Sequence, residues 1–192
     1  MSQLSLFGAT AREPALADLE GLLAGNGQVA RRGDQARLSV VVEDGWRVEV
    51  LATEMAECFG FAADIGPAET GTTIGTPWLA DLRPIADAWS LGAVKCPPLR
   101  WVLDGPRLRW WCLAGGSRTA EMYTLALGPN DEHAWSAVGS ALASAGVPGA
   151  LVGPRADGPA YRIVGRRRLG RLLELVGDPP PGLPDSAWPA LV

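Results

Sequence analysis

The side chains best suited to metal binding or nucleophilic catalysis are few and far apart in this chain. Its three cysteines are Cys58, Cys96 and Cys112, and its one histidine is His133. A structural zinc site needs four closely spaced ligands, and three widely separated cysteines form no disulfide framework. We therefore expect no disulfide, no zinc or other resident metal, and no cofactor.

Arginine is the other residue type that can carry chemistry, because its guanidinium pairs with phosphate. The chain has 17 basic and 21 acidic residues, for a net charge of −4. The charge is uneven: residues 43–94 hold nine acidic and two basic residues, whereas residues 95–171 hold eleven basic and five acidic ones. A net-acidic chain can still present one basic surface to a phosphate backbone. Arg166, Arg167 and Arg168 begin an expected helix, where cations are unfavourable, so these residues are either a solvated helix start or phosphate contacts.

The hydrophobic pattern divides the chain into two similar halves. In the first, Leu16, Leu19, Leu22 and Leu23 predict a helix over 15–24, which Gly25-Asn26-Gly27 ends. The pattern then predicts strands 28–32 and 36–42, a helix over 47–59, a loop with short strands over 60–77 and a helix over 78–89. The second half predicts helix 106–113, strand 120–127, helix 131–145 capped by Asn130, strands 149–152 and 160–164, and helix 166–176.

This repeated order predicts an α+β fold in which two pseudo-symmetric αββα repeats form one domain. We place the repeats at about 15–94 and 95–177, with a mobile tail over 1–14 and a proline-rich tail over 178–192. No apolar run is long enough to cross a membrane, and no signal-peptide pattern opens the chain. We therefore expect a soluble cytoplasmic protein without membrane contact.

Each half has a short segment at the end of its first helix that resembles a motif of a known protein family. Residues 19–27, Leu-Glu-Gly-Leu-Leu-Ala-Gly-Asn-Gly, resemble the LAGLIDADG motif of homing endonucleases. Residues 111–117, Trp-Cys-Leu-Ala-Gly-Gly-Ser, resemble its variant Trp-Tyr-Met-Asp-Asp-Gly-Ser. Lys95-Cys96-Pro97-Pro98, Trp101-Val102-Leu103 and Tyr161-Arg162-Ile163 are similar to flanking segments of that family. The resemblance covers about residues 15–177 and implies paired motif helices at a pseudo-twofold axis, with a β-sheet saddle for DNA.

The same resemblance argues against cleavage. In that family each motif helix presents an acidic residue just before its last glycine, and the two carboxylates hold Mg²⁺ at the scissile phosphates. The matching positions here are Asn26 and Gly115, which carry no charge. Losing both carboxylates removes most of the electrostatic stabilisation that phosphodiester cleavage needs. We therefore expect no catalytic residue and no metal at these degenerate motif positions.

The resemblance does imply DNA contacts, with little sequence preference. The expected contact residues are Arg31, Arg32, Arg37, Arg118, Arg162, Arg166, Arg167 and Arg168. The first hairpin, which carries Arg31, Arg32 and Arg37, lines the DNA groove in the resembled fold.

A second resemblance lies in Gln3-Leu4-Ser5-Leu6-Phe7, which is similar to the pentapeptide by which bacterial proteins dock on the DNA polymerase sliding clamp. Leu6 and Phe7 suit a role as buried anchors, and Gln3 as a polar latch. The other interpretation is that Leu4, Leu6 and Phe7 pack on the protein's own core. The clamp interpretation implies the sliding clamp (beta subunit) as partner and a nucleoid-associated monomer.

Together these features predict a non-catalytic DNA-binding accessory protein of replication or repair. Three alternatives remain open. The first is a Mg²⁺-dependent endonuclease that uses other carboxylates near the motif end, such as Asp18 or Glu20. The second is a transcription regulator, and the third is a clamp-binding scaffold without DNA contact.

Overall fold

The computed structural model of the chain describes residues 8–9, 12–119, 121–154 and 158–191. The pentapeptide Gln3–Phe7, interpreted as a clamp-binding motif, lies outside these described residues.

The first half alternates helices with antiparallel hairpins. After a 3₁₀ turn over Leu16–Leu19, its elements are α1 (Glu20–Ala24), β1 (Gln28–Arg32), β2 (Gln35–Val42), α2 (Gly45–Phe59), β3 (Asp64–Ala68), β4 (Gly71–Gly75) and α3 (Arg83–Ala88). A short ribbon of β5 (Ser90–Leu91) and β6 (Val94–Lys95) leads toward the second half.

The second half follows the same order. Its elements are α4 (Gly105–Gly115), β7 (Gly116–Thr119), β8 (Met122–Ala126), α5 (Glu132–Ser144), β9 (Ala150–Val152), β10 (Ala160–Val164) and α6 (Arg166–Val176). The first half forms a sheet with the strand order β1-β2-β4-β3, and the second forms one with the order β7-β8-β10-β9. All of these pairs are antiparallel. The fold is therefore α+β, as the sequence predicts, with the same strand order in both sheets.

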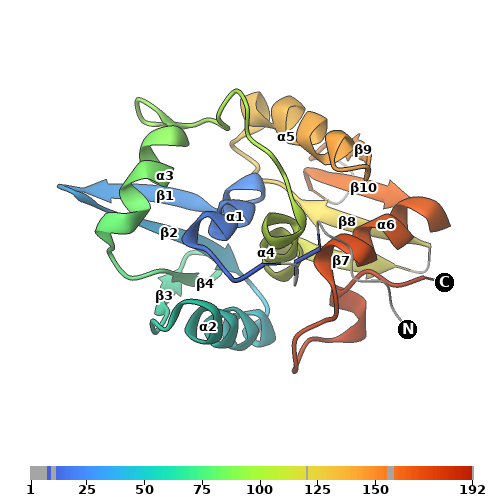
Figure 1. The fold of residues 1–192 in the computed structure, drawn as a ribbon, viewed down its shortest axis with the longest axis horizontal. Helices are drawn as coiled ribbons and strands as arrows, with labels where there is room; N and C mark the ends of the chain where they lie inside the picture. The colour runs from blue at the N-terminus through green and yellow to red at the C-terminus, as the bar shows by residue number, and fades with distance from the viewer. Residues whose placement is uncertain (1–7, 10–11, 120, 155–157, 192) are drawn as a thin grey trace.

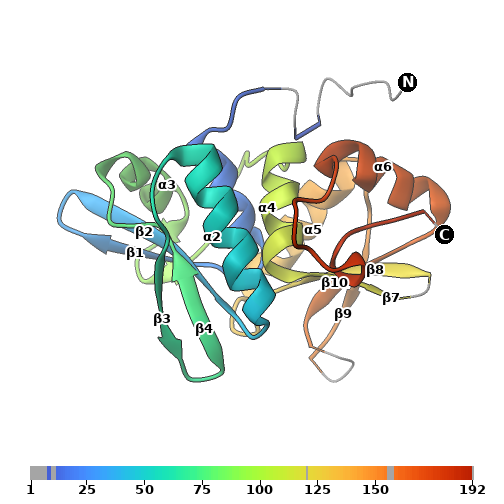
Figure 2. The same cartoon turned by 90° about the horizontal axis from the view of Figure 1, so that it is seen from below.

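The helices gather on one side of the two sheets. Figure 2 shows α2, α4 and α6 above the strands and no helix below them. Strand β2 explains this layering, because Ala36, Leu38, Val40 and Val42 alternate with less buried residues and enter the core. In β8, Tyr123 and Leu125 do the same. In the part of the chain that the structure describes, no helix covers the opposite face of either sheet.

Helices α1 and α4 pack against each other at the centre of the molecule (Figure 1). The approach is close because Gly21 has no side chain: a Cβ there would overlap the carbonyl oxygen of Arg107. Hydrophobic residues of both halves join around this pair in one buried cluster. The contact that the sequence predicts between the two motif helices is thus present.

The structure differs from the sequence expectation at four places. Residues 60–77 are mostly the paired strands β3 and β4, where the sequence predicts a loop with short strands, and β7 lies where the sequence predicts only the end of a helix. The predicted helix over 78–89 is shorter, with a 3₁₀ turn at Ala80–Leu82 before α3. Asp131, not Asn130, precedes the first turn of α5.

The segment after α6 packs on the second half. Trp188 is buried, and its indole nitrogen donates a hydrogen bond to the carbonyl oxygen of Gly177 (3.0 Å). The hydroxyl of Tyr123 donates to the carbonyl oxygen of Ala187 (2.9 Å). In the described part of the chain, no helix is long and apolar enough to cross a membrane.

Candidate nucleic-acid interface

The C-terminal ends of α1 and α4 meet above one residue of β8. A Cβ at Gly25 or at Gly115 would lie 3.1 Å from an atom of Ala126, so both helix ends approach the same strand position. The indole nitrogen of Trp111 donates to the carbonyl oxygen of Ala126 at 2.7 Å, which fixes α4 to this strand. The two helix ends that carry the degenerate motif positions Asn26 and Gly115 therefore converge on one place.

The buried side chain of Lys95 binds backbone carbonyl groups that directly follow α1. Lys95 Nζ lies 3.0 Å from the carbonyl oxygen of Gly25 and 2.9 Å from that of Gly27. It also lies 2.5 Å from a carboxylate oxygen of Asp131. The last carbonyl groups of a helix lack partners within the helix and favour a cation nearby. Burial lowers the pKa of the Lys95 ammonium, and the ion pair with Asp131 opposes that shift.

A buried arginine does the same for α4. The Arg47 guanidinium donates to the carbonyl oxygens of Leu113 (2.8 Å) and Gly116 (2.6 Å). It also pairs with Asp44 at 3.1 Å. The convergence of helix ends is thus held by two cations, Lys95 and Arg47. Sequence reasoning assigned a role to neither residue, because only the packing brings them to these carbonyl groups.

A hollow of about 640 Å³ opens beside Gly115 on the uncovered face of the second sheet. Its lining includes Ser117, Thr124 and Arg162. In the described part of the chain, Arg162 Nε is buried without a hydrogen-bond partner. Glu43 and Asp44 line the same hollow, and sequence reasoning missed both as neighbours of the motif end. Among the described residues, no group of three His, Cys, Asp or Glu side chains is arranged to hold a metal ion.

The carboxylates named for an endonuclease alternative lie elsewhere. Asp18 pairs with Arg12, and Glu20 accepts from Trp101 (2.8 Å) and Arg107 (2.7 Å). Both residues belong to the beginning of the motif helix, away from its Gly25 end. The expectation that Asp18 or Glu20 lies near the motif end is therefore wrong, because the helix itself separates them from it.

The eight arginines proposed as DNA contacts divide into three groups. Arg32, Arg37 and Arg162 lie on the uncovered sheet faces. Register places Arg32 beside Gln35 and Arg37 beside Ala30, and both guanidinium groups lie over the ring of Trp78, at 4.4 and 5.8 Å. Arg37 also pairs with Asp64 at 2.9 Å.

Arg31 and Arg118 point to the opposite side. Arg31 binds Asp87 of α3 (3.3 Å) and the carbonyl oxygen of Gly92 (2.9 Å). Arg118 donates to the carbonyl oxygen of Asp185 (2.9 Å) in the segment after α6. The third group, Arg166, Arg167 and Arg168, is exposed at the start of α6 and lies with Gly146 and Pro148 rather than on a sheet face.

His133 contacts the backbone of the segment that connects the two halves. It is exposed at the start of α5, and its Nε2 lies 2.6 Å from the carbonyl oxygen of Lys95.

The three cysteines differ in burial: Cys112 is fully buried, whereas Cys58 and Cys96 are half-buried free thiols. Burial raises the pKa of the Cys112 thiol to about 12.

Known proteins match this chain in structure but not in sequence. Neither the protein-family models nor the curated proteins give a match to this chain. Among solved structures, the homing endonuclease I-WcaI bound to its DNA recognition sequence superposes with a TM-score of 0.60 at 10% identity, over 92% of this chain and 83% of that one. Mesophilic variants of the homing endonuclease I-DmoI give a TM-score of 0.50 at 14% identity, over 83% of this chain and 93% of that one. The chain has the fold of homing endonucleases.

Proposed function

We propose that this protein binds duplex DNA along the uncovered faces of its two sheets and does not cut it. The observation that carries this proposal is that two uncharged motif positions, Asn26 and Gly115, converge beside the sheet face that carries Arg162. The I-WcaI structure, which contains DNA, supports the same use of the fold here.

The number of arginines on the uncovered faces predicts how strongly DNA affinity should depend on salt concentration. The uncovered faces supply Arg32, Arg37 and Arg162, and each phosphate contact contributes about −0.9 to the slope of log affinity against log salt. A slope of about −3 is therefore expected, together with weak dependence on sequence. Fluorescence anisotropy on labelled duplexes across a salt series measures both.

A matched pair of variants tests the location of the interface. Replacing Arg32, Arg37 and Arg162 with alanine should remove most of the affinity and flatten the salt slope. Replacing Arg166, Arg167 and Arg168 with alanine makes the same change in charge away from the sheet faces, and it should cost much less. Equal losses in the two variants contradict the sheet-face interface, and no binding by the unaltered protein at low salt favours the scaffold alternative.

An endonuclease remains the second candidate because Glu43 and Asp44 line the hollow beside Gly115. These carboxylates would be ligands of a metal ion if one were recruited to this hollow. Incubation with supercoiled plasmid and Mg²⁺ should give no nicking under our proposal. Nicking that disappears in the Glu43→Gln, Asp44→Asn variant would establish the endonuclease instead.

The proposal includes docking on the replication sliding clamp through Gln3, Leu4, Ser5, Leu6 and Phe7, in an accessory role in replication or repair. This part rests on the resemblance of the five residues. A short peptide that must become ordered on binding should have a Kd on the order of micromolar.

Leu6 and Phe7 are the anchors to test. Changing both to alanine should weaken clamp binding by about two orders of magnitude or more, because each buried side chain is worth roughly 1.5–3 kcal/mol. Ser2→Ala, outside the pentapeptide, should leave the affinity unchanged. Isothermal titration with purified clamp gives the affinities, and unchanged binding by the double variant contradicts the motif assignment.

A further inference from the structure

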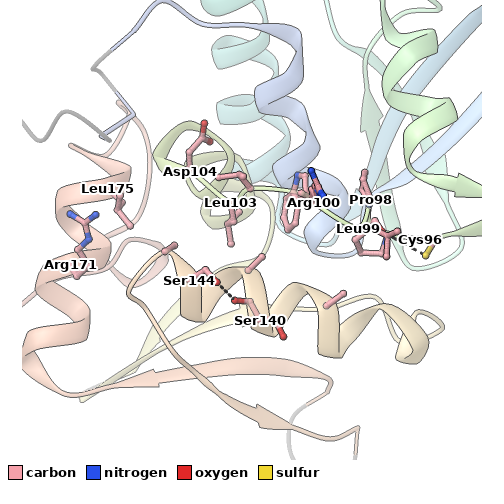
Figure 3. Close-up of a pocket in the computed structure, with 16 residues that line it drawn as sticks. Cys96, Pro98, Leu99, Arg100, Leu103, Asp104, Ser140, Ser144, Arg171 and Leu175 are labelled. Carbon is pink, nitrogen blue, oxygen red and sulfur yellow. Dashed lines mark hydrogen bonds between the residues drawn. The ribbon is translucent and has the colours of Figure 1, made fainter.

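An apolar groove lies away from the proposed DNA surface. It has a volume of about 750 Å³ and runs between the connecting segment 96–104 and helix α5, with Arg171 and Leu175 of α6 at one end (Figure 3). Ser140 and Ser144 face into it from α5. Two large hydrophobic residues of the connecting segment are exposed here: Leu99 fully and Val102 to 67%. An apolar surface of this kind is typical of a binding site for another segment.

The chain before α1 passes one end of this groove. The backbone nitrogen of Ala9 donates to the carbonyl oxygen of Leu175 at 2.7 Å. Farther along, an Arg12 guanidinium nitrogen lies 3.4 Å from a carboxylate oxygen of Asp104. Leu175 and Asp104 both line the groove, so Ala9 and Arg12, which follow residues 1–7 in the sequence, lie at its edge.

Length and chemistry then favour these residues as the occupant. Seven residues span at most about 23 Å when extended. The floor of the groove on α5, from Ala137 to Ala145, is about 12 Å long. Residues 1–7 contain no charged side chain and include Leu4, Leu6 and Phe7.

Two of the three charged side chains that line the groove already have partners, and the third, Arg100, is exposed. Asp104 pairs with Arg107 at 3.0 Å, and Arg171 pairs with Glu174 at 3.1 Å. An uncharged, leucine-rich segment therefore suits the groove better than an acidic or basic one does. We propose that Leu4, Leu6 and Phe7 dock in this groove of their own chain.

Docking of this kind regulates partner binding, a consequence that rests on the proposed function. The side chains that would fill the groove are those that would anchor the clamp, so one segment cannot occupy both sites. The apparent clamp affinity is then reduced by the fraction of molecules in which the segment is docked.

Photo-crosslinking in the full-length chain tests the docking directly. A benzophenone side chain introduced in place of Phe7 should crosslink, within one molecule, to peptides that contain residues 96–104 or 137–145. Mass spectrometry after proteolysis maps these sites. Crosslinks to other parts of the chain, or between two copies of the chain on a denaturing gel, overturn the proposal.

Matched variants on α5 test whether the groove itself is the site. Ser144→Trp fills the groove and should lower the yield of these crosslinks several-fold. Ala143→Trp places the same side chain next to it on the same helix but outside the groove lining, and it should leave the yield unchanged. Leu99→Asp alters only an exposed side chain and should also lower the yield, so a misfolded Ser144→Trp does not decide the matter. Unchanged yields in both Leu99→Asp and folded Ser144→Trp overturn the proposal.

Titrations with the clamp distinguish docking of residues 1–7 in the groove from the proposed binding of the same residues to the clamp. If both hold, Ser144→Trp binds the clamp more tightly than the unaltered protein does, and Ala143→Trp does not. If no variant binds the clamp, the proposed docking partner is wrong, while the crosslink map still decides the groove. If the clamp binds but Ser144→Trp does not change its affinity, the regulatory consequence is wrong.

Discussion

At the scale of single residues, Lys95 shows how a charge can be retained in the interior. Its ammonium binds two carbonyl oxygens at the end of α1 and the Asp131 carboxylate. Removing one partner of a buried ion pair leaves the other without compensation, and such changes cost about 3–5 kcal/mol. Lys95→Met should therefore lower the free energy of unfolding by about that amount, measured by urea denaturation.

Two further variants separate the ion pair from general disruption. Adding Asp131→Leu to Lys95→Met removes the orphaned carboxylate and should recover part of the loss. Glu174→Gln breaks the exposed pair with Arg171 and should cost less than about 1 kcal/mol. Equal losses in Lys95→Met and Glu174→Gln contradict the assignment of a structural role to the buried pair.

Cys112 supplies a pH-dependent prediction. Burial raises the pKa of its thiol to about 12, whereas the unfolded thiol has a value of 9.0. Between these values the unfolded chain releases a proton that the folded chain keeps, so the free energy of unfolding falls as pH rises, by about 1.4 kcal/mol per pH unit. Burial also raises the pKa of Tyr123, which adds to this fall, and the lowered pKa of Lys95 opposes it.

The contribution of Cys112 appears as a difference between two proteins. The Cys112→Ala variant should lose less stability between pH 9 and pH 10.5 than the unaltered protein does, as measured by denaturation at each pH. Below about pH 8, where the thiol is protonated in both states, the difference between the two proteins should be constant. Parallel curves across the whole range contradict the burial effect on this thiol.

At the scale of elements, the sequence predicts a helix or strand well where one strong pattern governs it. Strand β1 and helix α6 lie at their predicted positions, because regular hydrophobic spacing and glycine boundaries mark them. Strand β3 was not placed and strand β7 was missed, both for identifiable reasons. Strand β3 is an edge strand that includes Pro67, and β7 follows α4 directly at Gly116, where a Cβ would overlap the hydroxyl of Tyr123.

The candidate site was predictable to a similar extent. The resemblance of two short segments was enough to predict that Asn26 and Gly115 lie at paired helix ends. The cations that hold these ends, Lys95 and Arg47, reach them from distant parts of the sequence. The division of the arginines between two sheet faces depends on strand register, which the sequence alone did not provide.

The close packing of α1 and α4 gives a prediction at this scale. Gly21→Ala places a Cβ against the Arg107 backbone, so the helices must separate, and such overpacking typically costs about 1–3 kcal/mol. Gly45→Ala, at the start of α2, meets no atom within 4 Å and should be neutral or stabilising by up to about 1 kcal/mol. Thermal denaturation of the two variants measures the contrast, and a tolerated Gly21→Ala contradicts the close approach.

At the scale of the whole molecule, the two halves share one core. The buried cluster includes Leu22 and Leu38 from the first half together with Trp111 and Leu125 from the second. Polar contacts also cross between the halves: Arg109 of α4 pairs with Glu54 of α2 at 3.2 Å, and Arg47 of α2 binds the end of α4. A shared core predicts that neither half unfolds without the other.

Hydrogen exchange tests this coupling. In the unaltered protein, the slowest amides of β2 and β8 should exchange with the same free energy, because only global unfolding opens either strand. Arg47→Met removes the guanidinium donors to the Leu113 and Gly116 carbonyl oxygens, and a buried group that loses its partner costs about 1–3 kcal/mol. The variant should therefore lower the free energy of exchange in both strands by the same amount. If β8 becomes faster while β2 does not change, the second half opens independently and the shared core does not unite the two sheets.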